Sequence, residues 1–68
     1  MFREYDVVRL RKDRPSDNLL AGARGTVLLV YLQPPHAPAY EVEFTDGVGN
    51  AIAILTISEE DIEKDSGI

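Results

Sequence analysis

Residues 21–31 read Ala-Gly-Ala-Arg-Gly-Thr-Val-Leu-Leu-Val-Tyr, and this stretch decides the fold. Two glycines three positions apart predict a tight backbone corner, because glycine adopts conformations that other residues avoid. The apolar run that follows predicts a strand over residues 25–32, either buried on both faces or strongly bent at the glycine. We expect residues 27–30 to fill the core and Arg24, at the tip of the corner, to stay open to a partner.

Further strands are indicated on both sides of this corner. Residues 5–10 alternate so that Val8 and Leu10 share an inward face. Residues 40–44, Tyr-Glu-Val-Glu-Phe, alternate without exception and predict apolar side chains inward and acids outward. A glycine-containing turn then leads into a strand over residues 51–56. A last short strand or an unstructured tail follows from residue 63.

The connections are short and carry at most single helical turns. One such turn is predicted in the loop of residues 11–23, where it lays Leu19 and Leu20 over one end of the core. Another is predicted over residues 57–62. The fold class is therefore all-β: a small SH3-like barrel of about five short strands with one-turn helices in loops. We expect one domain over residues 1–68, with a core at about 5–62 and a frayed C-terminal tail.

The motifs resemble those of known small β-domains. The corner over residues 22–27 is similar to the glycine-centred turn of KOW-type modules in ribosomal and transcription proteins. The whole chain resembles more closely a family of small bacterial SH3-like proteins of unknown function. The matching motifs are Asp6-Val7-Val8, Gly22-Ala23-Arg24-Gly25-Thr26-Val27, Tyr40-Glu41-Val42-Glu43-Phe44 and Leu55-Thr56-Ile57. This resemblance implies a fold, and it carries no activity or site with it.

Composition restricts the classes of function. The 68 residues hold no cysteine, so disulfides and thiolate metal sites are excluded. No targeting segment is visible, and the apolar run of residues 27–32 is far below the ~18–20 residues that span a bilayer. We therefore expect a cytoplasmic protein without a membrane partner. The net charge of −5 disfavours general binding to a phosphate backbone.

The sequence lacks the combinations of side chains that catalysis or cofactor binding requires. His36 is the single histidine and stands among prolines, so neither a metal site nor a nucleophile with its base can be assembled around it. The acidic run of residues 59–65 lacks the ligand spacing of a calcium loop. We predict no enzyme activity, no cofactor and no metal.

Three features remain as candidate contact surfaces. The basic residues of the first loop can converge with Arg24 on a polyanion, as in KOW-type modules. The acidic run can dock a basic partner. The proline-rich loop with Tyr31 beside it is stiff and carries an aromatic anchor. The candidate partner-binding residues are Arg11, Lys12, Arg24, Tyr31, Pro34, Pro35 and His36.

Two hypotheses of function follow. The first is a non-enzymatic protein–protein interaction module, an antitoxin-, immunity- or accessory-type partner of a more basic protein. The alternative is a KOW-like RNA- or ribosome-binding module that uses the Arg-rich first loop and the glycine turn. Association with further copies of the chain is a third arrangement that the small size allows.

Overall fold

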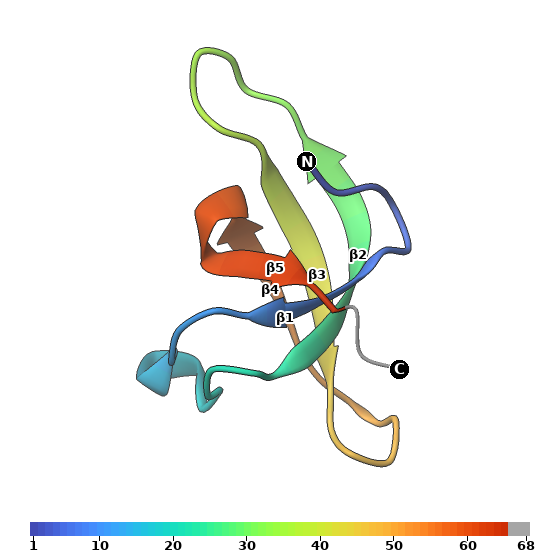
Figure 1. Ribbon diagram of the computed structural model, residues 1–68. Helices are drawn as coiled ribbons and strands as arrows, with labels where there is room; N and C mark the ends of the chain where they lie inside the picture. The colour runs from blue at the N-terminus through green and yellow to red at the C-terminus, as the bar shows by residue number, and fades with distance from the viewer. Residues whose placement is uncertain (66–68) are drawn as a thin grey trace.

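Five antiparallel strands and two single turns of 3-10 helix make up the fold in the computed structural model, which describes residues 1–65 (Figure 1). The elements in chain order are β1 (Val7–Leu10), η1 (Pro15–Asp17), β2 (Arg24–Tyr31), β3 (Ala39–Thr45), β4 (Ala51–Ser58), η2 (Glu59–Asp61) and β5 (Ile62–Lys64). The all-β class, the five strands and the one-turn helices predicted from the sequence are confirmed.

The strands form one sheet in the order β4-β3-β2-β1-β5. Figure 1 shows β1 and β5 crossing in front of β3, while the loop between β2 and β3 and the loop between β3 and β4 extend to opposite ends of the molecule. The sheet does not close into a barrel, because β4 and β5 stand at its two edges and are not paired with each other.

Strand β2 lies between β1 and β3 and pairs with both. Of the two alternatives predicted for its apolar run, burial on both faces is wrong, because Leu29 and Tyr31 are exposed. The first residues of β2 pair with β1, from Arg24 to Thr26, and residues 25–31 pair with β3. A register shift between Val27 and Leu29 marks an irregularity in the ladder. Such a bulge bends the strand and increases its local twist.

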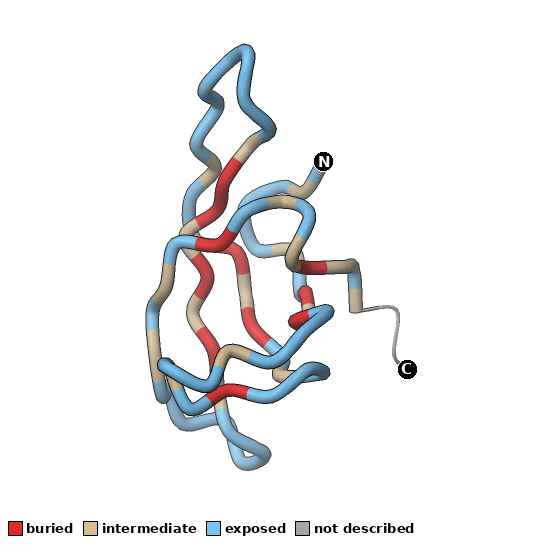
Figure 2. Tube along the Cα trace, turned by 90° about the vertical axis from the view of Figure 1, so that its left-hand side faces the viewer, coloured by how far each residue is buried: buried red, intermediate tan, exposed pale blue. Residues whose placement is uncertain are grey.

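The core lies on the concave side of the sheet. Figure 2 shows most of the buried residues along the strands, while the loops are mainly exposed. The predicted inward faces of β1 and β3 are confirmed, because Val8, Leu10, Tyr40, Val42 and Phe44 are all buried. The buried cluster is completed by Leu19, Val27, Ile57 and Ile62.

The two glycines of the corner have different roles. Gly22 has a φ of +91°, a left-handed conformation that suits the turn. Gly25 lies within β2 and is buried against β3. A Cβ atom on it would stand 2.6 Å from Val42 Cγ1 and 2.9 Å from the Glu43 carbonyl oxygen. Gly25 therefore lets two strands approach closely, rather than supplying a special backbone angle.

Two predictions about apolar residues are corrected. The turn η1 precedes the leucine pair, and only Leu19 is buried, whereas Leu20 is 70% exposed. Residues 27–30 do not all fill the core: Leu29 is 48% exposed. The register shift explains this, because Leu29 lies opposite Glu41, on the outer face of the sheet.

Of the two alternatives predicted from residue 63, a short strand or an unstructured tail, the structure shows the strand, which spans Ile62–Lys64. Strand β5 pairs with β1, and the Asp65 N–H donates to the Val7 carbonyl oxygen (2.9 Å). The end predicted to fray comprised residues 65–68. At Asp65 that prediction is wrong, because its backbone bonds to β1 and its carboxylate pairs with Arg9 and Arg24. Residues 66–68 lie outside the described residues.

Candidate interaction surface

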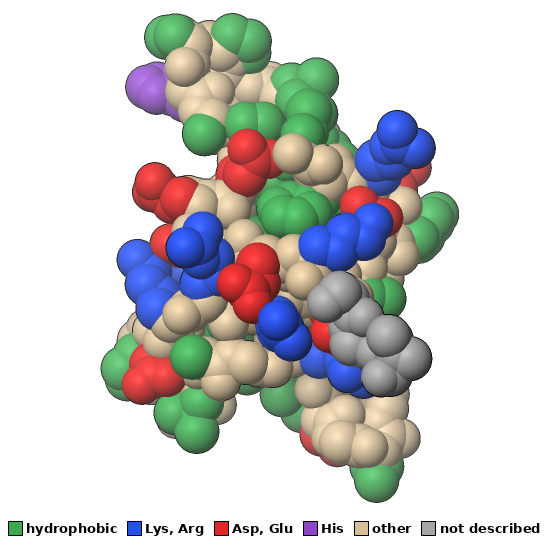
Figure 3. Space-filling model, viewed as in Figure 1, with side chains coloured by type: hydrophobic (Ala, Val, Ile, Leu, Met, Phe, Trp, Pro, Cys, Tyr) green, Lys and Arg blue, Asp and Glu red, His purple; other side chains and the backbone are tan. Residues whose placement is uncertain are grey.

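Opposite charges from the two ends of the chain face each other across β1 and β5. Figure 3 shows blue and red side chains interleaved over this part of the surface. We call this set the charge seam. Its pairs are Arg9 with Glu63 (2.7 Å) and Asp65 (3.7 Å), Arg24 with Asp65 (2.5 Å), Lys12 with Asp61 (3.1 Å), Arg11 with Glu63 (4.0 Å) and Lys64 with Asp6 (3.6 Å).

The strand register builds this seam. Arg9 lies directly opposite Glu63 on β5 and opposite Arg24 on β2, so one row across three strands carries all three charges. The Glu63 hydrogen bond and charge raise the pKa of the Arg9 guanidinium above its ordinary value. Such exposed pairs each contribute about 0–1 kcal/mol. The basic loop and the acidic run that the sequence offered as separate docking surfaces therefore engage each other.

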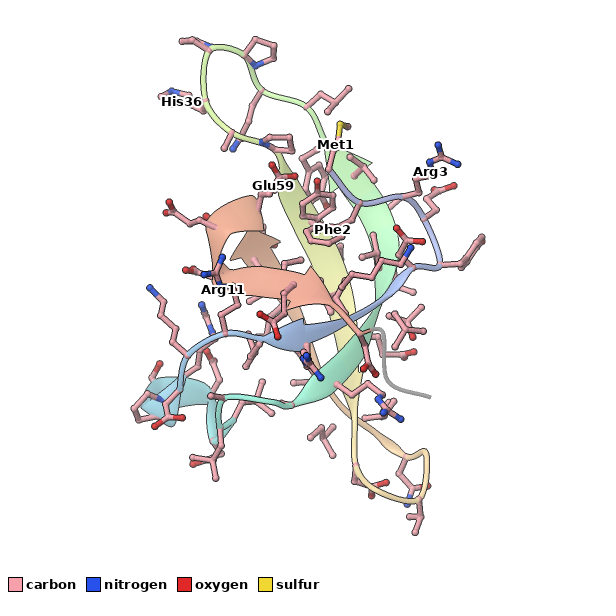
Figure 4. All side chains as sticks on the ribbon, viewed as in Figure 1. Met1, Phe2, Arg3, Arg11, His36 and Glu59 are labelled. Atoms are coloured by element: carbon pink, nitrogen blue, oxygen red, sulfur yellow. The ribbon has the colours of Figure 1, made fainter. Side chains whose placement is uncertain are left out.

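The predicted partner-binding residues do not form one site. Arg11, Lys12 and Arg24 belong to the charge seam. Tyr31 ends β2 on the outer face of the sheet, and Pro34, Pro35 and His36 are exposed in the loop that follows. Figure 4 shows His36 on this projecting loop, well away from Arg11.

A second surface covers the convex side of β2, β3 and β4. Register places Leu29 opposite Glu41, Tyr31 opposite Ala39, and Ile54 opposite Glu43. Leu29, Tyr31 and Ile54 are all more than two-fifths exposed. We call the set Leu29, Tyr31, Glu41, Glu43 and Ile54 the outer face. It presents apolar side chains around two central carboxylates.

The carboxylates of the outer face have no cationic partner among residues 1–65. Glu41 accepts a hydrogen bond from the Thr56 hydroxyl (2.9 Å), and neither Glu41 nor Glu43 forms an ion pair in that range. By contrast, every Lys and Arg of the described chain except Arg3 is engaged by a carboxylate. The charge that remains for a partner on the outer face is therefore negative.

Sequence reasoning found only Tyr31 of this surface. The alternating pattern predicted that Glu41 and Glu43 face water, and they do lie on the outer face. It gave no reason to expect exposed apolar residues beside them. Leu29 stands in a continuous apolar run, and Ile54 alternates with small apolar residues, so neither pattern shows which face meets solvent. The sequence signal was one of composition: residues 41–54 hold three acidic residues and no lysine or arginine.

The hydroxyl of buried Tyr40 links the start of the chain to η2 by two hydrogen bonds. It donates to Glu59 Oε1 (2.5 Å) and accepts from the Phe2 N–H (3.0 Å), and Figure 4 shows Phe2 and Glu59 converging there. The Phe2 ring meets the Tyr40 ring edge-on, with centroids 5.3 Å apart. Burial raises the pKa of the Tyr40 hydroxyl above its ordinary 10.0, and the Glu59 hydrogen bond raises it further. Tyr40 therefore stays neutral at physiological pH.

Two hollows in the surface formed by residues 1–65 are lined by polar and charged side chains. One lies beside the charge seam and is lined by Arg11, Lys12, Glu60 and Asp61. The other lies between the glycine corner and the β3–β4 loop, near Arg24 and Asp46. Neither is lined by a histidine or serine. No group of three or more potential metal-ligating side chains occurs in the part of the chain that the structure describes.

The sheet order and the two faces define an open, five-stranded all-β domain. Within that class, the chain belongs to the family described as a domain of unknown function (DUF4926), which matches residues 4–64. No curated protein and no solved structure matches the chain. Over residues 1–65, no helix has the length and apolar character needed to cross a bilayer.

Proposed function

We propose that this domain is a non-enzymatic interaction module that binds a more basic protein through its outer face. The observation that carries the proposal is the pair Glu41 and Glu43, which stand uncompensated at the centre of an exposed apolar surface. An antitoxin-, immunity- or accessory-type role in the cytoplasm of a bacterium is consistent with this chemistry.

The outer face has the two components of a specific interface. Tyr31 and Leu29 offer apolar area, and tyrosine is among the residues that dominate binding energy when a partner covers them. The two carboxylates attract a basic partner and disfavour an acidic one, which raises the association rate and the specificity. Because their strand is held between β2 and β4, these carboxylates are positioned before binding and lose little entropy.

Charge reversal of the outer face tests the proposal. The double variant Glu41→Lys, Glu43→Lys serves as bait in a pull-down from the native lysate, beside the unchanged chain. We expect the unchanged chain to retain a basic protein that elutes with salt. The amount retained by the variant should be lower by at least about tenfold, which is the size of effect seen when interfacial charge pairs are disrupted. The control is Glu4→Lys, Glu60→Lys, which makes the same change in net charge at exposed residues outside the outer face.

The control decides between a site and a general charge effect. Retention by the control and loss by the outer-face variant support the proposal. Equal loss from both baits would mean that net charge alone attracts the protein. Equal capture by all three baits would place the contact elsewhere, and either result overturns the proposed outer-face site.

The nucleic-acid alternative receives less support from the contacts. Arg11, Lys12 and Arg24 each have a carboxylate partner, so a phosphate backbone must compete with Asp61, Glu63 and Asp65. We expect no retardation of single-stranded RNA in a gel-shift assay at physiological salt. A shift that weakens steeply with salt and disappears on Arg24→Gln would instead favour the KOW-like hypothesis.

A further inference from the structure

The two edges of the sheet are very different. Strand β5 has three residues and carries Glu63 and Lys64. Short length and charged side chains both hinder pairing with another strand. Strand β4 has eight residues, Ala-Ile-Ala-Ile-Leu-Thr-Ile-Ser, without a charge, proline or glycine. It pairs with β3 on one side only, and no strand formed by residues 1–65 covers its other side. This long uncharged edge lacks the usual protection.

Both faces of β4 are also incompletely covered. Ile52 and Ile54 are 52% and 53% exposed on the outward side, although β4 lies in a sheet with a packed core. On the inward side only Ile57 is fully buried, and Ala53 and Leu55 are half-buried. A strand placed beside β4 would cover apolar surface on both faces.

The free backbone groups of β4 can be assigned from the ladder. The Glu59 N–H donates to the Pro38 carbonyl oxygen (3.1 Å), and the β3–β4 register is unbroken from Ser58 to Ala53. In an antiparallel pair, successive residues turn their N–H and C=O groups alternately to opposite sides. Ile54, Thr56 and Ser58 therefore direct theirs to the free edge, where they are available to a new strand.

We infer that the β4 edge pairs with β4 of a second copy of this chain, antiparallel and about a two-fold axis. Two copies of an uncharged strand can pair without charge repulsion, because every cross-strand pair joins apolar or hydroxyl side chains. A two-fold axis makes the contact self-limiting, because each copy has one such edge. A second sheet also supplies burial that a domain of this length lacks.

Net charge does not oppose this arrangement. The nearest uncompensated carboxylates, Glu41 and Glu43, are on β3 of each copy. In a continuous sheet the two β3 strands would be three strand spacings apart, roughly 14 Å. This exceeds the screening length of about 8 Å at physiological ionic strength.

The alternation also restricts the register of the dimer. Pairs must join residues of the same face, and the residues that share hydrogen bonds must be those with free groups. Ile54 opposite Ile54 of the second copy satisfies both conditions. It places Ile52 opposite Thr56 and forms an apolar row across the junction of the two sheets.

Sedimentation equilibrium over a wide concentration range tests the pairing. We expect reversible dimerisation of the unchanged chain. The variant Ile54→Lys places like charges opposite each other and removes the apolar contact, so the dissociation constant should rise by about tenfold or more. Leu20→Lys makes an equivalent change at an exposed residue outside the sheet and should leave the dimer intact. Circular dichroism checks that each variant retains the strand signal.

Disulfide trapping provides a second readout in this cysteine-free chain. In the inferred register, Ile54→Cys brings two sulfurs within bonding geometry at about 5.5 Å between Cα atoms. Ile52→Cys separates its two copies by four residues along the strand, about 13 Å, and should stay reduced. We expect oxidation to yield a covalent dimer only from Ile54→Cys.

Several results would overturn the inference. They are a chain that stays monomeric at all concentrations, a dimer that survives Ile54→Lys, or equal loss on Leu20→Lys. Cross-linking of Ile52→Cys in preference to Ile54→Cys would overturn the two-fold register. The inferred dimer and the proposed function share Ile54, and their tests still separate them. Sedimentation equilibrium uses the purified chain without another protein, and Glu41→Lys, Glu43→Lys changes β3 and leaves the β4 edge as it is.

Discussion

Replacing Gly25 with alanine is expected to reduce the free energy of unfolding by about 3 kcal/mol, the upper end for overpacking a close-packed site. The added Cβ would lie 2.6 Å from Val42 Cγ1, 2.9 Å from the Glu43 carbonyl oxygen and 3.0 Å from Phe44 Cδ1. A side chain can rotate away, but the Glu43 oxygen belongs to the backbone of β3. The strands themselves must therefore separate.

This loss is a large fraction of the total. A single core of this size supplies about 3–5 kcal/mol. Gly25→Ala should therefore be marginally folded, and Gly25→Val, with two more methyl groups at the same position, should be unfolded at room temperature. Urea denaturation followed by circular dichroism measures both variants.

Gly47→Ala is the matched control. No atom lies within 4 Å of a Cβ at Gly47, and its φ is not in the left-handed region. The same chemical change should alter stability by less than about 0.5 kcal/mol, as at other open surface positions. Equal urea midpoints for Gly25→Ala and Gly47→Ala would show that close approach of β2 and β3 does not require glycine.

The sequence predicts a strand best where one face is apolar and the other charged. In residues 40–44 each inward position is Tyr, Val or Phe and each outward position is Glu, so only one orientation buries apolar area without burying charge. Val8 and Leu10 were placed correctly for the same reason, because the opposite orientation would bury Arg9.

Prediction failed where both faces are apolar. Leu29 stands in a run with no polar residue to mark its outward side, and a register shift that depends on β3 decides its exposure. In β4, either face can be chosen as the inner one from the sequence alone, because Ala53 and Ile54 are both apolar. The outer face and the β4 edge therefore required tertiary information.

The charge seam shows a different limit. The sequence displays a basic first half and an acidic second half, and that imbalance suggested two binding surfaces. Whether the halves meet depends on β5 returning to β1 in one register, with Arg9 opposite Glu63. This register cannot be predicted from the composition of the two halves. The charge seam favours a basic partner over a polyanion, because it engages the cations and leaves carboxylates for a partner.

Truncating Tyr40 to alanine is expected to cost about 3–5 kcal/mol, as for other buried aromatic residues, and to leave the domain largely unfolded. Tyr40 is fully buried, and its ring packs edge-on against Phe2. Tyr40→Phe keeps the ring and removes only the hydroxyl. Its cost should be about 1–3 kcal/mol, because the Phe2 N–H and the Glu59 carboxylate each lose a hydrogen-bond partner.

The Tyr40 hydroxyl also links stability to alkaline pH. Burial, followed by the Glu59 hydrogen bond, raises its pKa in the folded state above the ordinary value of 10.0. The unfolded chain therefore releases the proton first as pH rises, and this stabilising contribution is complete below pH 10.0 and lost as pH passes through the folded value. Urea midpoints measured across this range should fall in the unchanged chain more steeply than in Tyr40→Phe. Parallel pH profiles for the two proteins would show instead that the phenol ionises equally in both states, and would contradict its structural role.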